Sequence, residues 1–278
     1  MFRSALVALK PEVANDALLT YAVELALQSS LHLAGIAIVD RDIVAPPEPV
    51  PLGGMAFKQQ RDAARLAAGR AQSHAVLADF IERCQAAGVS HETIACEEAL
   101  GTELAHAVQC HDLLLLGHTG GTVAGGETGA HSHLPAILRR NPRPAIVTPA
   151  IARWGKNVVV AYDGSVQAAR AIAAFVGSGL ERETEVHVVS YGADLATARE
   201  VAAWAAAFLK RHEFSVVTHA GVESGTAVAE RILAHCGQLE AKLLVMGACS
   251  KSTLWEFVFG SVTQRLLAEA TFPVLLDH

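Results

Sequence analysis

The sequence predicts an α/β protein built from two tandem domains, each an open parallel sheet with helices on both faces. Three observations lead to this fold class. Short apolar runs alternate with alanine-rich stretches of helical period, the same order of elements occurs twice, and 278 residues suit two domains of ordinary size. Strands that alternate with helices are joined by right-handed crossovers, which make the sheet parallel.

The first copy of the pattern extends to about residue 150. We expect strands where short apolar runs are bounded by polar or turn residues, and helices where apolar residues recur every three to four positions. In chain order these are a strand at 5–9, a helix over about 13–28, a strand at 33–39, a helix beginning near 101–104, a strand at 113–116 and an edge strand at 145–147. Pro144 suits the start of an edge strand, where its missing donor costs little.

The second copy repeats this order. It predicts a strand at 158–162, a helix at 166–176, a strand at 186–191, a helix beginning near 225–228, a strand at 243–246, a helix at 262–267 and an edge strand at 274–276. Pro149 and Gly155 place the linker at about 148–156, so the predicted domains are 1–150 and 154–278. Pairing of the two edge strands would give an internal pseudo-dimer, and whether two such chains then form a homodimer stays open.

The first domain is longer than the second, and most of its additional residues fall in a surplus segment at about 41–61. It contains four prolines between positions 46 and 51 and two glycines at 53 and 54. Proline removes a hydrogen-bond donor and clashes with the preceding turn, so the segment cannot be helical throughout. We expect a mobile surface loop, and a lid over a ligand is the alternative.

Composition limits the partners of the chain. Its 22 basic and 28 acidic residues give a net charge of -6, and neither half is basic, so nucleic acid and anionic membrane surfaces are not expected partners. No apolar run approaches the ~18 residues that a membrane helix needs. The 5 cysteines form no CxxC pair and suit small core residues in a reducing compartment. We therefore expect a cytoplasmic protein.

Two segments of the second half fall at the carboxyl ends of strands, where parallel sheets bind their ligands. One is the turn that carries Asp163, and the other runs from Gly247 to a helix start at Gly260 and Ser261. An aspartate in such a turn either caps the next helix or accepts a hydrogen bond from a base or ribose. A glycine-serine helix start offers free amide groups to an anion such as phosphate.

The spacing within the second segment resembles a known nucleotide loop. Gly247 is followed by two residues and Ser250, then by nine residues, Gly260 and Ser261. The universal stress protein family has glycine, two residues, glycine, nine residues, then glycine with serine or threonine. The segments VVVAYDGS, which contains Asp163, and FGSVTQRLLAEATFPVLL are also similar to that family. Because the resemblance extends over both halves, the chain resembles a tandem universal stress protein.

This resemblance implies Rossmann-like domains of the adenine nucleotide alpha hydrolase-like type, each with a parallel sheet of five strands, that bind ATP, with or without Mg²⁺. By position, Asp163 would contact the adenosine end of the nucleotide, and Tyr191 would lie near the adenine. The other implied contacts would line the ribose or hold the phosphates: Gly247, Ser250, Gly260, Ser261 and Val262. The function implied is a stress-response regulator that binds ATP in its C-terminal domain.

The chain departs from the family pattern at two places. Ser250 stands where the pattern has its second glycine, and a positive φ there would cost a serine about 1 kcal/mol, although its hydroxyl can donate to a phosphate. In the first half Lys10 stands where the second half has Asp163, and the spacing of the following loop has changed. We therefore expect the nucleotide motif of the N-terminal domain to be degenerate.

Histidines suggest a different ligand for the first half. Eight of the 13 histidines precede residue 150, and His118, His131 and His133 would meet in one loop region. Imidazole is a common zinc ligand. No HExxH motif or paired-cysteine frame supports a metal site, so solvated or capping histidines are the simpler interpretation.

Several function classes stay open at this point. The sequence lacks GxxxxGK[ST], GxSxG and the protein-kinase motifs, and it has no nucleophile-base pair at catalytic spacing. Binding is therefore favoured over catalysis, with slow ATP hydrolysis at most. One alternative is a scaffold or interaction protein that binds no nucleotide and takes a metal or another ligand in its first domain. The other alternative is a slow ATPase.

Overall fold

The structure is a computed structural model, and it describes residues 1–11, 13–37, 45, 48–50, 53–94, 102–118, 138, 141–152, 155–225, 227–248 and 260–277. Its N-terminal half contains β1 (Ser4–Leu9), α1 (Asp16–Ser29), β2 (His32–Ala37), α3 (Met55–Ala87), β3 (His91–Ile94), α4 (Thr102–Gln109), β4 (Leu113–His118) and β5 (Ala145–Pro149). Its C-terminal half contains β6 (Asn157–Ala161), α6 (Val166–Ser178), β7 (Val186–Gly192), α7 (Leu195–Arg211), β8 (Val216–Val222), α8 (Ala227–Gln238), β9 (Ala241–Gly247), α9 (Ser261–Glu269) and β10 (Val274–Asp277).

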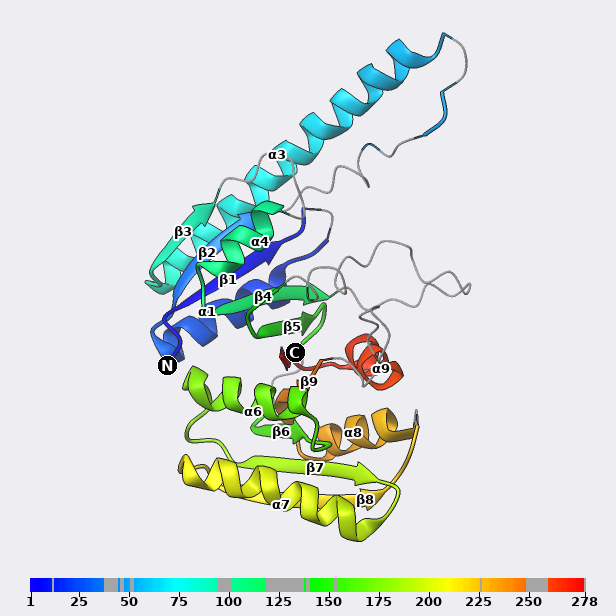
Figure 1. The fold of residues 1–278 in the computed structure, drawn as a ribbon. Helices are drawn as coiled ribbons and strands as arrows, with labels where there is room; N and C mark the ends of the chain where they lie inside the picture. Colours follow the sequence, from blue (N-terminus) through cyan, green and yellow to red (C-terminus); the bar gives the residue numbers. More distant parts are fainter. Residues whose placement is uncertain are drawn as a thin grey trace.

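One sheet of ten strands runs through both halves, in the order β3-β2-β1-β4-β5-β10-β9-β6-β7-β8. Figure 1 shows the halves meeting at the middle of this sheet. Neighbouring strands are parallel within each half, and β5 and β10 pair antiparallel, with Val274 opposite Val147 and Leu275 opposite Ile146. The predicted class, a duplicated α/β fold with five parallel strands per half, is confirmed. Since β5 ends at Pro149, the link between the halves is confined to residues 150–156.

Alternate residues of each strand pack into two separate layers of core. In β1, Ala5, Val7 and Leu9 pack on the side of α1, α3, α6 and α7. Leu6 and Ala8 pack on the side of α4, α8 and α9. The central strands are thus buried on both faces, which explains why the sequence shows them as continuous apolar runs rather than alternating ones.

The surplus segment differs from our expectation. We predicted a loop over 41–61, but residues 55–61 form the first turns of α3, which projects away from the sheet and packs on it only toward its C-terminal end (Figure 1). The prolines stop at Pro51, and the sequence from Met55 onward is rich in residues of high helix propensity. The loop prediction was therefore wrong for 55–61, and much of the proline-rich part lies outside the described residues.

Three of the cysteines can be placed. Cys84 and Cys236 are buried, and burial raises the pKa of the Cys84 thiol to about 11 and that of Cys236 to about 12, so both serve as small core residues as expected. Cys110 is exposed, so this interpretation is wrong there. The other two cysteines lie outside the described part of the chain.

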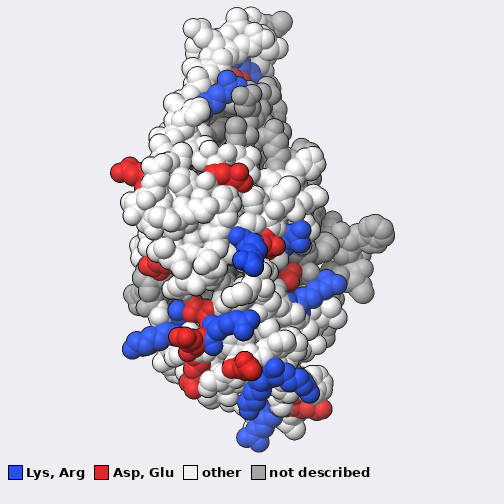
Figure 2. Space-filling view, turned by 90° about the vertical axis from the view of Figure 1, so that its left-hand side faces the viewer, with Lys and Arg blue, Asp and Glu red and all other residues white. Residues whose placement is uncertain are grey.

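The outer surface carries charges of both signs. Figure 2 shows basic and acidic side chains interspersed over the C-terminal half on the face in view. Several form ion pairs, such as Arg265 with Glu230 at 2.7 Å and Arg231 with Glu223 at 3.1 Å. Among the described helices, none is long and apolar enough to cross a membrane.

Candidate functional site

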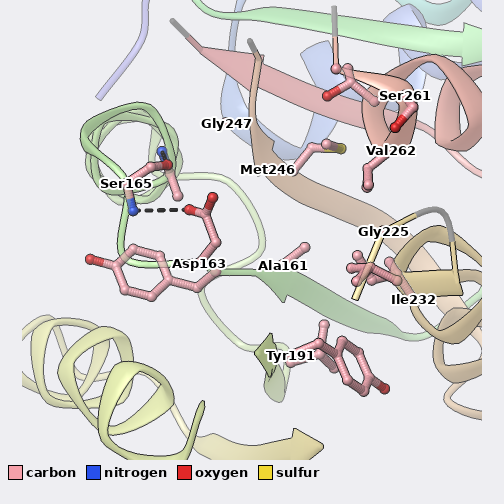
Figure 3. Close-up of a pocket in the computed structure, with 16 residues that line it drawn as sticks. Ala161, Asp163, Ser165, Tyr191, Gly225, Ile232, Met246, Gly247, Ser261 and Val262 are labelled. Carbon is pink, nitrogen blue, oxygen red and sulfur yellow. Dashed lines mark hydrogen bonds between the residues drawn. The ribbon is translucent and has the colours of Figure 1, made fainter. Parts of the chain in front are cut away.

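A cavity of about 430 Å³ opens at the carboxyl ends of β6, β7 and β9 (Figure 3). It lies where the strand order reverses between β6 and β9, which is the usual place for a ligand in an open parallel sheet. Its walls are largely apolar and include Ala161, Val189, Ile232 and Met246. A volume of this order with a few polar groups on the rim suits a small organic ligand.

Asp163 lies in the turn between β6 and α6. Gly164 has a φ of +78°, which lets the chain turn sharply, and the Ser165 amide donates to Asp163 Oδ1 at 2.9 Å. The cap of α6 is Ser165 itself, because its hydroxyl accepts from the Ala168 amide at 3.2 Å. Since the cap position is already filled, the Asp163 carboxylate bonds one turn amide and is directed into the cavity (Figure 3).

The start of α9 forms the opposite wall of the cavity. Gly260 is the N-cap residue, and it has no side chain that could cap this helix. The amide groups of Ser261, Val262 and Thr263 are those that a helix leaves without an intrahelical acceptor. Ser261 and Val262 face Asp163 across the cavity in Figure 3, so the positive end of the α9 dipole is turned toward the space between them.

Gly247 ends β9 and lies against the first turn of α6. A Cβ atom at this position would lie 2.5 Å from the Ala168 amide nitrogen and 2.7 Å from the Gln167 carbonyl carbon. Both are backbone atoms, so the neighbour cannot move aside at low cost. The family resemblance implied a ligand contact for this glycine, and the structure adds a packing reason that the resemblance did not reveal.

Tyr191 lines the cavity with its ring, and its hydroxyl is turned toward α8 (Figure 3). The hydroxyl lies 2.6 Å from His235 Nδ1. A Cβ atom at Gly221 of the neighbouring strand would lie 2.8 Å from the ring, so β8 passes close behind it. Burial is the main cause that raises the pKa of Tyr191, so the phenol stays protonated at neutral pH. A ligand would meet the ring rather than the hydroxyl.

The expected contacts within the described part of the chain all line this cavity: Asp163, Tyr191, Gly247, Gly260, Ser261 and Val262. Ser250 lies outside the described residues. Sequence reasoning missed Ser165, Gly225 and the apolar wall. Gly225 carried a usable signal, because GTAV at 225–228 matches GTEL at 101–104 in the first half.

The corresponding turn of the first half is built differently. Lys10 follows β1, and the Asn15 side chain donates to the Lys10 carbonyl at 2.9 Å and to the Val13 carbonyl at 3.0 Å, so the turn is closed by its own side chain. His118 ends β4, and its pKa is lowered first by burial and then by the charge of Lys10. His131 and His133 lie outside the described residues, so the metal alternative stays a prediction. Within the described ranges no three potential ligands are placed so that they could hold a metal ion.

The half of the chain that holds the cavity is similar to a known family. The model of the universal stress protein family matches residues 155–278, the half that holds the cavity. Residues 155–278 belong to the universal stress protein family. Universal stress protein Slr1230 of Synechocystis sp. (strain ATCC 27184 / PCC 6803 / Kazusa) is 29% identical over 164 residues, which are 59% of this chain. The match spans 57% of the length of that relative.

Solved universal stress proteins show the same fold. A universal stress protein from Archaeoglobus fulgidus DSM 4304 has a TM-score of 0.72 at 15% identity, covering 98% of this chain and 97% of that one. The likeness therefore extends over both halves. The universal stress protein from Archaeoglobus fulgidus in complex with dAMP covers 44% of this chain and 97% of its own, at 21% identity and a TM-score of 0.36.

Proposed function

We propose that this protein is a stress-response regulator that binds ATP in its C-terminal half. One observation carries the proposal: the Asp163 carboxylate and the uncapped start of α9 face each other across one cavity of about 430 Å³. A carboxylate accepts hydrogen bonds from ribose or base, and free helix amides favour a phosphate. An adenine nucleotide has these two ends, and an apolar wall between them suits its rings.

Within the described part of the chain, the phosphates would meet helix dipoles rather than side-chain cations. Among the lining residues that the structure describes, none is lysine or arginine. The α9 amides, the Ser261 hydroxyl and the open approach at Gly260 would hold the anionic end of the nucleotide. Any Mg²⁺ would accompany the nucleotide and compensate its charge.

Binding would act as a signal rather than as the first step of a reaction. The described lining residues offer one carboxylate, that of Asp163, and two phenols, those of Tyr162 and Tyr191, as titratable groups near the ligand, with no nucleophile-base pair. A nucleotide shifts a protein between states only by binding one state better than another. We propose that the N-terminal half, with its altered turn at Lys10, does not bind ATP. We also propose that the β5·β10 pairing makes the chain an internal pseudo-dimer.

Equilibrium binding of labelled ATP tests this proposal. Asp163→Asn should weaken binding about tenfold, since a hydrogen bond to a charged acceptor contributes about 1.5–3 kcal/mol. Gly260→Val should abolish saturable binding, because a branched side chain would fill the approach to the helix start. Asp194→Asn is the matched control, because this exposed cap of α7 does not line the cavity and asparagine caps equally well. No saturable binding of ATP at millimolar concentration would reject the proposal.

A further inference from the structure

The outer side of β8 is an open edge of the sheet. β8 is the last of the ten strands, and it lies at the end of the molecule opposite the free end of α3 (Figure 1). It pairs with β7 on one side, and no described strand pairs with its other side. Strand β8 therefore presents backbone groups that another strand could bind.

The backbone groups on this open side can be assigned residue by residue. The Ser215 carbonyl accepts from the Val186 amide at 2.9 Å. The Glu223 amide donates to the Gly192 carbonyl at 3.0 Å, so the odd-numbered residues of this segment face β7. Backbone groups alternate in direction along a strand. The amide and carbonyl groups of the even-numbered residues therefore face outward: Val216, Thr218, Ala220 and Val222.

β8 lacks the features that usually protect an edge strand. Proteins keep such strands from pairing by making them short, or by placing charged side chains, proline or a bulge on them. β8 has 7 residues, VVTHAGV, with no lysine, arginine, aspartate, glutamate or proline, and its register with β7 is continuous. Val217 and Val222 are 37% and 59% exposed. An apolar edge of this kind favours pairing with another strand.

The opposite end of the sheet is protected. β3 has 4 residues, HETI, which include a histidine and a glutamate. The Glu92 side chain is 57% exposed and lies 3.6 Å from His32 Nε2. A short strand with an exposed carboxylate is a poor partner for a second strand. Of the two outer strands of the described sheet, β8 alone is therefore open, so association through it stops at two copies and does not continue into a filament.

A second copy of β8 fits this edge. Two identical strands can pair antiparallel about a two-fold axis, and the register that uses the whole strand places His219 opposite its own copy. Val216 then lies opposite Val222 and Thr218 opposite Ala220, so that outward-facing residues meet each other. Pairing brings no like charges together, because β8 has no acidic or basic residue besides His219, and burial lowers the pKa of that histidine.

The chain already uses this kind of contact. The antiparallel pairing of β5 with β10 joins the two halves through their inner edge strands, and β8 is the outer edge of the same sheet. A strand of this length spans about 23 Å. Pairing along it gives an interface at the small end of the range for specific complexes, so the dimer should depend on protein concentration.

We propose that β8 is a docking edge for a second copy of this chain, and that two chains pair antiparallel through it into one continuous sheet. This inference goes beyond the proposed function. It concerns a strand that does not line the cavity, so it holds or fails independently of ATP binding.

Sedimentation equilibrium of the full chain at roughly 1–100 µM tests the inference. The wild-type chain should form a dimer in this range. Thr218→Pro removes an outward amide and leaves the bonds of β8 to β7 intact, so the dissociation constant should rise more than about tenfold. Thr218→Lys places a charge on the edge without changing any backbone donor, and it should have the same effect.

Thr93→Pro is the matched control. The Leu33 amide donates to the Ser90 carbonyl at 3.0 Å, so the backbone groups of Thr93 face outward on β3, at the other edge of the sheet. This variant should dimerise like the wild type. Circular dichroism checks the fold of each variant, and if Thr218→Pro does not fold, Thr218→Lys decides.

Three results would overturn the inference. The first is a wild-type chain that stays monomeric at about 100 µM or forms species larger than a dimer. The second is a dimer whose dissociation constant is unchanged by Thr218→Lys. The third is a dimer that Thr93→Pro weakens as much as Thr218→Lys does, because the two chains would then meet through another part of the surface.

Discussion

Gly247 places the end of β9 against the first turn of α6, and both elements border the cavity. Because a Cβ atom would lie 2.5 Å from a backbone nitrogen of Ala168, Gly247→Ala must push the two elements apart. We expect the free energy of unfolding to fall by about 1–3 kcal/mol, the usual cost of overpacking. Urea denaturation followed by circular dichroism measures this change, and ATP binding should weaken in parallel.

Gly177→Ala is the matched control for that substitution. Gly177 lies in α6 as well, and a Cβ atom there would meet nothing within 4 Å. The change should stabilise the chain by about 0.5–1 kcal/mol, because glycine is the less favourable residue in a helix. Equal stability of the two variants would contradict the packing role of Gly247.

The sequence predicted single residues of the site unevenly. Asp163, Gly260 and Ser261 could be found because each follows a strand or begins a helix at a diagnostic spacing. The contact of Tyr191 with His235 joins residues 44 positions apart, and it depends on how α8 lies over β7. No local pattern encodes such a contact, so it could be recognised only in three dimensions.

At the scale of elements, α3 is held at one end. Phe80 is fully buried, and a Cβ atom at Gly35 of β2 would lie 2.7 Å from its ring, so strand and helix fit closely there. Met55 and Phe57 at the other end are 59% and 73% exposed. The prolines before Met55 showed where this helix could not begin. Which of its ends packs on the sheet and which projects into solvent could not be predicted from the sequence pattern.

Hydrogen exchange should divide α3 into two parts. Amides at about 57–66 should exchange far faster than those at 77–87, because local opening costs little free energy where few apolar side chains are buried. Helix α1, which buries Leu18, Leu19 and Leu25 along its length, is the internal reference and should be protected throughout. Uniform protection along α3 would contradict this expectation.

At the scale of the whole molecule, the two halves share one core. Ile146 of the first half and Leu275 of the second are fully buried, stand opposite each other in β5 and β10, and belong to one continuous apolar cluster. The duplicated order of elements was visible in the sequence, and so were both edge strands. Whether these edges would meet within one chain or between two chains was not, since an apolar edge strand pairs equally well in either way.

Ile146→Ala should therefore destabilise both halves. Trp204 of α7 reports on the second half, provided that Trp154 and Trp255 are replaced by phenylalanine. We expect its fluorescence transition in urea to move to a lower concentration, in line with a loss of about 2–5 kcal/mol for a buried aliphatic side chain. Leu27→Ala, on the exposed side of α1, should leave the transition unchanged. If Ile146→Ala left the urea midpoint of the Trp204 transition unchanged, the two halves would be independently folding units.

Because β5 and β10 pair antiparallel within one chain, their pairing does not depend on the concentration of the protein. The two strands belong to one covalent chain, so each meets its partner at an effective concentration fixed by the tether, on the order of millimolar for a short flexible link. Two separate chains joined by the same strands would come apart on dilution. Here the pairing is independent of how many copies the cell contains, so the ten-stranded sheet persists even when the protein is scarce.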